Sequence, residues 1–289
     1  MNGSLIQTEE TYFFSSSEEL GATNKTATGD RFEIRLDNPI SIPPSAVDVS
    51  IECVGANIWY TTPNIAAEYN NNTLYLFYGE IAVPVTIVIP DGLYGADTLN
   101  ATIRRAISAI DIPGAGGLKF ASTSIQISSN PATQRIVITL ADNLGMFADP
   151  LATNNVADTL GFTSDINATY TGQHFEGDSV AKLNRINSYL LHTDLVNDGI
   201  SINSSYDSIL AEIQLTADPG DLLTYRPYIP YRISGKHLKY GTKDILTFYL
   251  TDELNRPIDT FGENFSFTIV IRYKIYEHAT LLQLNTHHV

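Results

Sequence analysis

The C-terminal part of the chain has a regular alternation of apolar and polar residues. From Phe265 to Ile275 every second residue is apolar, and mostly polar residues lie between them. Alternate side chains of a strand point to opposite faces, so this run predicts a strand with one buried face. Residues 245–251 form a second strand-like run, and the connection between the two runs is rich in turn-forming residues. We therefore expect a long-looped antiparallel hairpin at this end of the chain.

Shorter runs with the same alternation, bounded by turn residues, recur along the chain, for example 31–37 before NPISIPP. Short strands at regular spacing are typical of a β-sandwich or barrel. About eight antiparallel strands are expected, near 31–37, 46–57, 73–79, 82–89, 186–196, 209–215, 244–251 and 264–275. Eight strands with long and short connections predict an all-β fold, a single jelly-roll β-sandwich.

One region departs from this pattern. Leu99, Ile103 and Ile107 fall at helical spacing after Asp97, which is the expected N-cap. A Gly-rich loop at 113–117 and a strand-turn-strand pattern over 124–140 follow, and residues 154–162 form a weaker helical stretch. These features predict a small α+β insertion that interrupts the β pattern.

The expected organisation has four parts. Residues 1–29 form an N-terminal arm, residues 30–90 the first part of the jelly roll, residues 91–172 the inserted subdomain and residues 173–289 the second part of the jelly roll. The arm is rich in Ser, Thr, Glu and Gly, which also fits a disordered tail. Its apolar Tyr12-Phe13-Phe14 favours an arm that docks on another surface.

Charge and cysteine content narrow the classes of function. The net charge is −15, and residues 1–180 hold 7 basic and 20 acidic residues. Because binding to a phosphate backbone depends on basic side chains, we expect no nucleic-acid partner. Cys53 is the only cysteine, so neither a disulfide within the chain nor a cysteine-based metal site is expected, and the thiol shares the predicted buried face with Val49 and Ile51. No signal peptide and no membrane span are predicted.

Motifs that carry catalysis are missing from the sequence. It has no His-x-His, no His-Glu-x-x-His, no Gly-x-Ser-x-Gly and no phosphate-binding loop. We therefore expect no catalytic residues, no metal site and no cofactor, and the protein is not expected to be an enzyme. A sandwich-fold hydrolase is the third-ranked alternative, because it would need a carboxylate pair that the sequence does not identify.

The segment TYRPYIPYR at 224–232 combines tyrosines and arginines, which are enriched at the centres of protein interfaces. Its prolines restrict it to edge or loop structure. One interpretation is an interface, and the other is a loop that caps a sheet and folds its tyrosines back on the core. The candidate interface residues are Tyr225, Arg226, Tyr228, Tyr231 and Arg232.

The order of these features resembles a known family. A strand ends in NPISIP, and after the insertion come the Tyr- and Pro-rich connection and LTDELNRPIDTFGENFSFTIVIRY. In this order the chain is similar to the penton, or minor capsid, proteins of virophages and polinton-like viruses of the mavirus type. The resemblance covers mainly residues 30–90 and 180–276.

The resemblance implies a structural role in the virion. Five copies would form the penton at each icosahedral vertex, in contact with trimeric jelly-roll major capsid proteins, after synthesis and assembly in the host cytoplasm. The acidic insertion at 91–172 would be exposed, and we expect it to be a candidate for attachment to a host receptor. The main alternative is a trimeric spike head or a glycan- or receptor-binding jelly-roll module, in which loops such as 224–232 contact the ligand.

Overall fold

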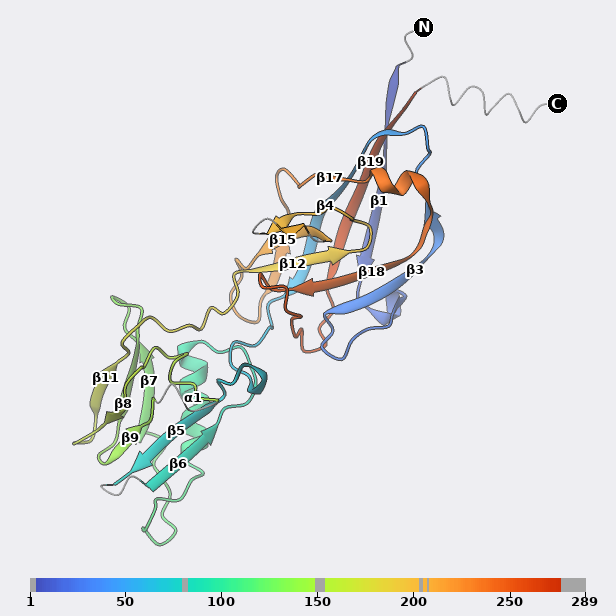
Figure 1. Ribbon diagram of the computed structural model, residues 1–289. Coiled ribbons are helices and arrows are strands. Elements are labelled where there is room, and N and C mark those ends of the chain that lie inside the picture. Colours follow the sequence, from blue (N-terminus) through green and yellow to red (C-terminus); the bar gives the residue numbers. More distant parts are fainter. Residues whose placement is uncertain (1–3, 80–82, 149–153, 203–204, 207, 277–289) are drawn as a thin grey trace, which may run out of the picture. The chain divides into compact units, whose positions relative to one another are not determined.

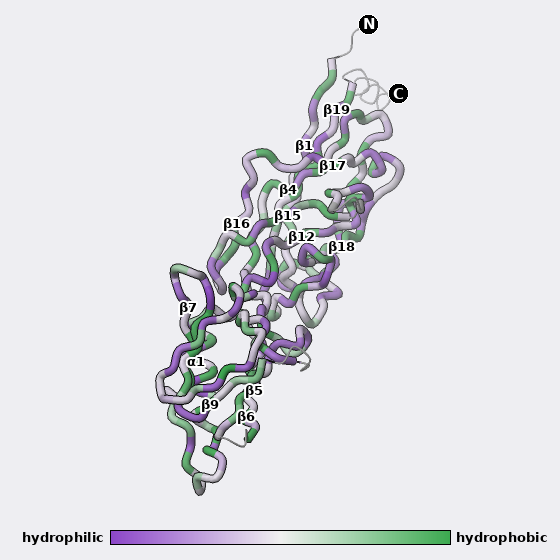
Figure 2. The backbone as a smooth tube through the Cα atoms, turned by 60° about the vertical axis from the view of Figure 1, so that its left-hand side comes forward, coloured by the Kyte–Doolittle hydropathy of each residue, from purple (hydrophilic) through white to green (hydrophobic). Residues whose placement is uncertain are grey.

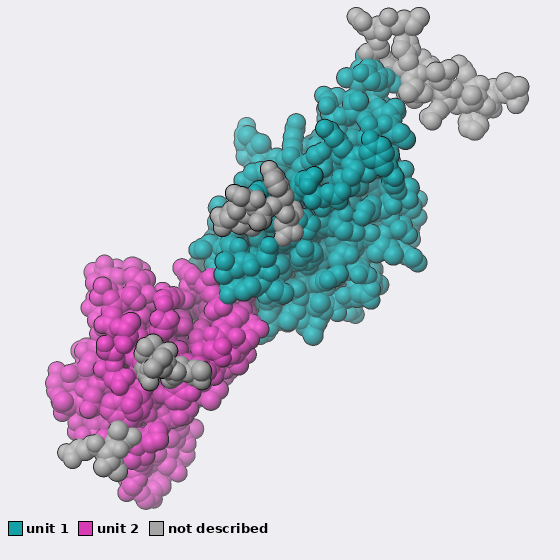
Figure 3. All heavy atoms as spheres, viewed as in Figure 1, with its two compact units in different colours: residues 1–61, 186–289 teal, residues 62–185 magenta. Residues whose placement is uncertain are grey.

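A computed structural model describes residues 4–79, 83–148, 154–202, 205–206 and 208–276. The chain folds into two compact units. One combines residues 1–61 with 186–289, and the other is residues 62–185, inserted between them (Figure 3). We call them the jelly-roll unit and the inserted unit.

The jelly-roll unit contains two antiparallel sheets (Figure 1). Sheet A has the order β1 (Leu5–Ser15), β19 (Ser266–Tyr276), β4 (Val47–Trp59) and β16 (Leu222–Tyr225), with β17 (Ile233–Ser234) also on β4. Sheet B has the order β15 (Ile209–Gln214), β12 (Ser188–Thr193), β18 (Lys243–Thr251), β3 (Arg31–Ile40) and β2 (Ala22–Thr23). A short ribbon of β13 (Ser201–Ile202) and β14 (Ser205–Tyr206) and the 3-10 turns η1 (Glu18–Leu20) and η3 (Lys236–Tyr240) complete the described elements.

The strand pairs of this unit are nested. The first strand β1 pairs with the last strand β19, β3 pairs with β18, β4 with β16, and β12 with β15. Successive pairs alternate between sheet A and sheet B, as when a long antiparallel ribbon is wrapped around itself. This nesting is the jelly-roll arrangement, and the prediction of an all-β jelly roll is confirmed.

Alternation along the strands creates the core between the two sheets. In β19, Phe267, Ile269 and Ile271 are almost fully buried, as the sequence pattern predicts. Phe248 of β18 faces them from sheet B, with its ring centroid 4.7 Å from that of Phe267. Cys53 is also buried in this core, and burial raises the pKa of its thiol to about 12. Figure 2 shows the hydropathy of the chain changing at short intervals along the strands.

The described residues of the inserted unit form two small sheets and one α-helix. The first sheet has the order β10 (Ile166–Asn167), β9 (Leu144–Met146), β5 (Thr73–Tyr78) and β6 (Val83–Val88). The second has the order β11 (Gln173–Glu176), β8 (Ile136–Leu140) and β7 (Ile125–Ser129), and the 3-10 turn η2 is Ala67–Tyr69. Helix α1 (Ala96–Ile107) contacts β7 and β6 and buries Leu99, Ile103 and Ile107, as predicted. The core of this unit is a mostly aliphatic cluster, with Phe120 and Phe162 among its members, to which both sheets and the helix contribute.

Two expectations about the inserted unit need correction. The N-cap of α1 is Gly95, whose backbone N–H donates to Thr98 Oγ1 at 3.0 Å, and Asp97 lies in the first turn instead. The described residues of 154–162 form turns and not a helix. Their apolar side chains, including Val156 and Leu160, are nevertheless buried in the core.

The domain boundaries differ from the expected ones. The inserted unit spans residues 62–185 and not 91–172. Strands β5 and β6, which were expected in the jelly roll, pair with each other, and β5 also pairs with β9 of the insertion. Their places in the jelly roll are taken by β1 and β16. The described part of the expected arm, residues 4–29, is therefore not an arm: Leu5–Ser15 is the strand β1, which pairs with β19 along its whole length and buries Phe14.

The expected C-terminal hairpin is also wrong. Strand β18 pairs with β12 and β3 in sheet B, whereas β19 pairs with β1 and β4 in sheet A. The connection between them crosses from one sheet to the other. Alternation determines which face of a strand is buried, but it does not determine the strand with which it pairs.

Candidate functional site

The segment between β16 and β17 leaves the edge of sheet A as a loop. Strand β16 pairs with residues 56–59 of β4, and β17 pairs with residues 50–51. Pro227 and Pro230 lie between the two pairings and have no backbone N–H to donate to a ladder. The sequence thus interrupts the edge strand, and residues 226–232 form what we call the edge loop.

The tip of the edge loop is exposed to solvent. Tyr228 is 98% exposed, Ile229 79% and Tyr231 56%. Arg226 is also exposed and has no ion pair among the described residues. Large apolar and aromatic side chains in this state resemble the anchors that protein interfaces bury. The alternative in which the tyrosines fold back on the core therefore does not describe Tyr228 or Tyr231.

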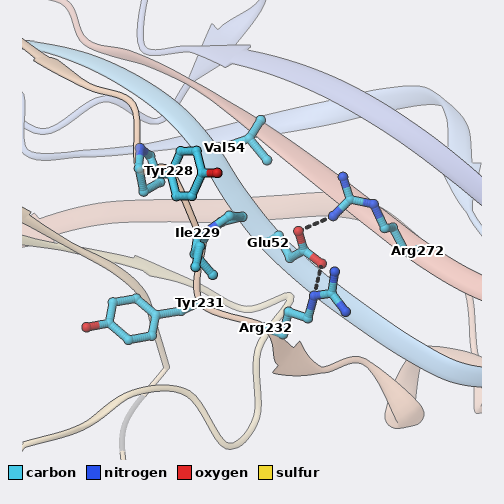
Figure 4. Close-up of a pocket in the computed structure, with 9 residues that line it drawn as sticks. Glu52, Val54, Tyr228, Ile229, Tyr231, Arg232 and Arg272 are labelled. Atoms are coloured by element: carbon cyan, nitrogen blue, oxygen red, sulfur yellow. Dashed lines mark hydrogen bonds and ion pairs between the residues drawn. The ribbon is translucent and has the colours of Figure 1, made fainter.

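The base of the edge loop is held by a buried carboxylate. The side chain of Glu52 in β4 is completely buried, and Arg232 Nε lies 3.1 Å from Glu52 Oε1. Arg272 Nη1 of β19 donates to Glu52 Oε2, and Arg272 Nε lies 2.8 Å from Glu9 Oε2 of β1. Figure 4 shows the two guanidinium groups on either side of the Glu52 carboxylate.

This ion-pair chain has a clear physical role. A buried carboxylate is costly unless charged donors compensate it, and Glu52 has two. The hydrogen bond to Glu52, followed by the one to Glu9, raises the pKa of Arg272. Because Arg232 is in the edge loop and Glu9 is in β1, the chain of ion pairs connects the loop to the opposite edge of sheet A.

Two depressions flank the edge loop. One has a volume of about 690 Å³ and is lined by Glu52, Val54, Arg272 and loop residues 227–232. The other has a volume of about 340 Å³ and is lined by loop residues and by Glu212, Gln214 and Thr216. Both are open and shallow, and Tyr231 lines both. The loop therefore projects between two concave surfaces.

The structure separates the five predicted interface residues into two groups. Arg226, Tyr228 and Tyr231 are exposed and available for contact. Arg232, although largely exposed, is held by Glu52, and Tyr225 is half-buried, with burial as the main cause that raises its pKa to about 12.

Sequence reasoning did not find Ile229, Glu52 or Arg272. Ile229 lies within the predicted segment, and its apolar side chain could have been included. Glu52 and Arg272 lie at polar positions of alternating strands, for which the pattern predicts exposure. Glu52 is nevertheless buried, and its pairing with Arg232 of the edge loop can be seen only in the folded structure.

The buried His192 serves the fold. The ring of the buried His192 stacks on Tyr249 at 4.4 Å, and His192 Nε2 lies 2.8 Å from Thr251 Oγ1. Within the described ranges no group of three or more His, Cys, Asp or Glu side chains could hold a metal ion. The helices described there include none that is long and apolar enough to cross a membrane.

Comparisons with known proteins give no family from the sequence and a distant similarity in structure. No protein-family model matches it, and no curated protein does. Among solved structures, it is similar to the selenomethionine-labelled mavirus penton protein, with a TM-score of 0.48 and 10% sequence identity over 93% of this chain and 99% of the other. The jelly-roll assignment rests on the strand pairing of this chain itself.

Proposed function

We propose that this protein is a structural capsid subunit that forms a homopentamer, the penton, at the fivefold vertices of an icosahedral virion. The observation that carries the proposal is the nested jelly-roll pairing together with an exposed Tyr/Ile/Arg loop at one edge of sheet A. Viral capsid proteins are one of the main groups built on jelly rolls. The sequence resemblance of residues 30–90 and 180–276 to penton proteins supports the same assignment.

The proposed mechanism is assembly through a rigid sandwich. The buried rings between the two sheets fix the frame, and side chains at its edges make the contacts between subunits. Each copy in a closed ring presents one patch to a neighbour and receives a different patch from the other neighbour. Jelly-roll major capsid proteins would surround the ring, and assembly would take place in the host cytoplasm.

Native mass spectrometry of the purified chain, with negative-stain images of the assemblies, tests this proposal. A pentamer with fivefold rings is the expected result. A trimer would overturn it in favour of a spike head. If the chain is monomeric alone, rings must appear when the major capsid protein is added, and their absence would overturn the proposal.

The inserted unit is proposed to face outward and to bind a host receptor. It is continuous in sequence and has a core of its own, so loops at its surface can vary without changing the jelly roll. Particles in which a short Gly/Ser linker replaces residues 62–185 should assemble but attach poorly to host cells. Unaltered attachment would contradict this role.

A glycan- or receptor-binding module remains the second candidate. It is favoured by the exposed Tyr228 and Tyr231 beside the depression of about 690 Å³. A glycan array separates the two: binding that is lost on Tyr228→Ala, by a chain that forms no ring, would favour the module.

A further inference from the structure

The two chain segments at the opposite edges of sheet A carry charges of opposite sign. Residues 222–243, which include the edge loop, contain five basic residues and no acidic one. Residues 1–24, which include β1 and η1, contain four acidic residues and no basic one. Because the chain has a net charge of −15, the basic character of residues 222–243 is a local exception. We call residues 222–243 the basic edge and residues 1–24 the acidic edge.

The two edges lie at opposite ends of the strand order. Strand β1 is at one end of sheet A, and β16 with β17 is at the other, separated by β19 and β4. They therefore cannot neutralise each other within one copy, except through the Glu9–Arg272–Glu52–Arg232 chain of ion pairs. A heterologous contact brings such opposite patches of two copies together.

Charged groups remain unpaired on both edges among the described residues. On the basic edge these are Arg226 and Lys239. On the acidic edge they are the exposed Glu18 and Glu19 of η1. Arg232 and Glu9 already form ion pairs within the chain, with Glu52 and Arg272, so they do not supply free charges for a contact between copies.

Each edge also exposes large apolar side chains. Tyr228 and Ile229 form the tip of the edge loop, and on the acidic edge Phe13 is 62% exposed and Leu20 65%. An interface needs apolar anchors to gain affinity, while complementary charges direct the encounter and exclude wrong partners. Both kinds of group are present on both edges.

We infer that the basic edge of one copy binds the acidic edge of the next, with the edge loop resting against β1 and η1 of its neighbour. This inference rests on the proposed pentamer and assigns the surfaces that form it. The partner that the edge loop binds is thus a second copy of this chain. Repeated contacts of this kind close into a ring in which every basic and acidic edge is used.

A charge-swap series tests the contact in the full-length chain. The variants are Arg226→Glu, the pair Glu18→Lys with Glu19→Lys, and the combination of all three. Assembly is measured by analytical ultracentrifugation over a range of concentrations and of salt, and circular dichroism checks that each variant is folded. Arg105→Glu, at an exposed position of α1, is the matched control for a charge reversal.

Each single-edge variant should weaken association by roughly tenfold or more, because an attractive contact becomes repulsive. The combined variant should restore association, and Arg105→Glu should leave it unchanged. Wild-type assembly should also weaken with added salt, which screens exposed charges. Tyr228→Ala, at a side chain that is 98% exposed, should weaken association without a change in thermal stability.

The outcomes separate this inference from the proposed function. A wild-type pentamer that Arg226→Glu and Tyr228→Ala leave intact, or that the combined variant does not restore, would overturn the edge contact and leave the vertex role standing. A wild-type trimer with restoration in the combined variant would support the edge contact and overturn the vertex role. A chain that never self-associates would overturn the contact.

Discussion

The jelly-roll unit and the inserted unit close their cores with different side chains. In the jelly roll, phenylalanine rings bridge the two sheets: Phe14 and Phe267 come from sheet A, and Phe248 lies 4.8 Å and 4.7 Å from their ring centroids. In the inserted unit, aliphatic side chains of two small sheets pack with the apolar face of α1. The jelly-roll core is thus rich in rings that contact one another between the sheets, whereas the core of the inserted unit is mostly aliphatic and includes Phe120 and Phe162.

The two units also differ in how far apart their partners lie in the sequence. Strands β1 and β19 of the jelly roll come from opposite ends of the chain, whereas all elements of the inserted unit lie within residues 62–185. Closing long loops costs entropy before the contacts form, so local topologies fold faster. The inserted unit can therefore fold before β1 and β19 of the jelly roll have paired.

The largest expected effect comes from removing a ring at the centre of the jelly roll. Phe267→Ala should lower the free energy of unfolding of this unit by about 3–5 kcal/mol, because it removes a buried ring that contacts several others. Ile138→Ala, in the core of the inserted unit, should cost that unit about 2–5 kcal/mol.

Calorimetry of the two variants checks whether the units are separate. Each substitution should lower the transition temperature of its own unit and leave the other transition in place. A single transition that both substitutions shift by similar amounts would show one cooperative body, and the distinction between two cores would fail.

The next effect concerns the buried carboxylate of the jelly roll. Glu52→Gln weakens hydrogen bonds to two guanidinium groups, and hydrogen bonds to charged groups contribute about 1.5–3 kcal/mol each. Because Arg232 remains solvated, we expect a loss near the lower end of that range for the unit, measured by urea denaturation. Asp48→Asn is the control, since it breaks an exposed ion pair with Lys274, and exposed ion pairs contribute little to the free energy of unfolding. Equal losses in both variants would contradict a special role of Glu52.

The third effect concerns close packing at a glycine of the inserted unit. A Cβ at Gly145 in β9 would overlap the ring of Phe77 in β5, and the centroid of that ring lies 4.6 Å from the ring centroid of Phe147, with the two ring planes tilted. Gly145→Ala should therefore cost this unit about 1–3 kcal/mol, as overpacking does in other cores. Gly241→Ala in the jelly-roll unit meets open space and extended backbone, and should change little. Thermal melts that rank the two glycines in the opposite order would contradict the packing of Phe77.

The hydrophobic pattern predicts the faces of strands better than their partners. The burial of Phe267, Ile269 and Ile271 follows from alternation alone. The same alternation at 73–79 is equally compatible with either unit, and only pairing with β9 places it in the insertion. Strand β1 was missed because most of its residues are polar and only Phe14 and Ser15 at its end are buried.

The candidate site was predictable in part. The prolines in 224–232 predicted edge or loop structure, and of the two interpretations left open for the tyrosines, Tyr228 and Tyr231 follow the one with exposed rings. The anchoring of Arg232 by Glu52 depends on residues 180 positions apart in the sequence. The sequence has no local signal for a pairing across strands, so this part of the site required the fold.

The smallest expected effect is a pH dependence, and it distinguishes the two units by their tyrosines. In the jelly roll, burial is the main cause that raises the pKa of Tyr273 and of Tyr225 to about 12, and hydrogen bonding to Glu10 adds to the effect at Tyr273. Unfolded tyrosines ionise near pH 10. The preference of the folded unit for neutral tyrosine therefore contributes fully below about pH 10, and stability falls as the pH rises from there towards about 12.

Thermal melts above pH 10, followed together with tyrosinate absorbance, check this expectation. The jelly-roll transition should fall more steeply with pH than that of the inserted unit, because the pKa is raised for Tyr12, Tyr60, Tyr225 and Tyr273 of the jelly roll and for Tyr94 of the inserted unit. Tyr273→Phe should reduce the slope for the jelly roll, because it removes a group that ionises on unfolding. An unchanged slope in Tyr273→Phe, or equal slopes for the two units, would show that the alkaline sensitivity has another origin than these buried hydroxyls.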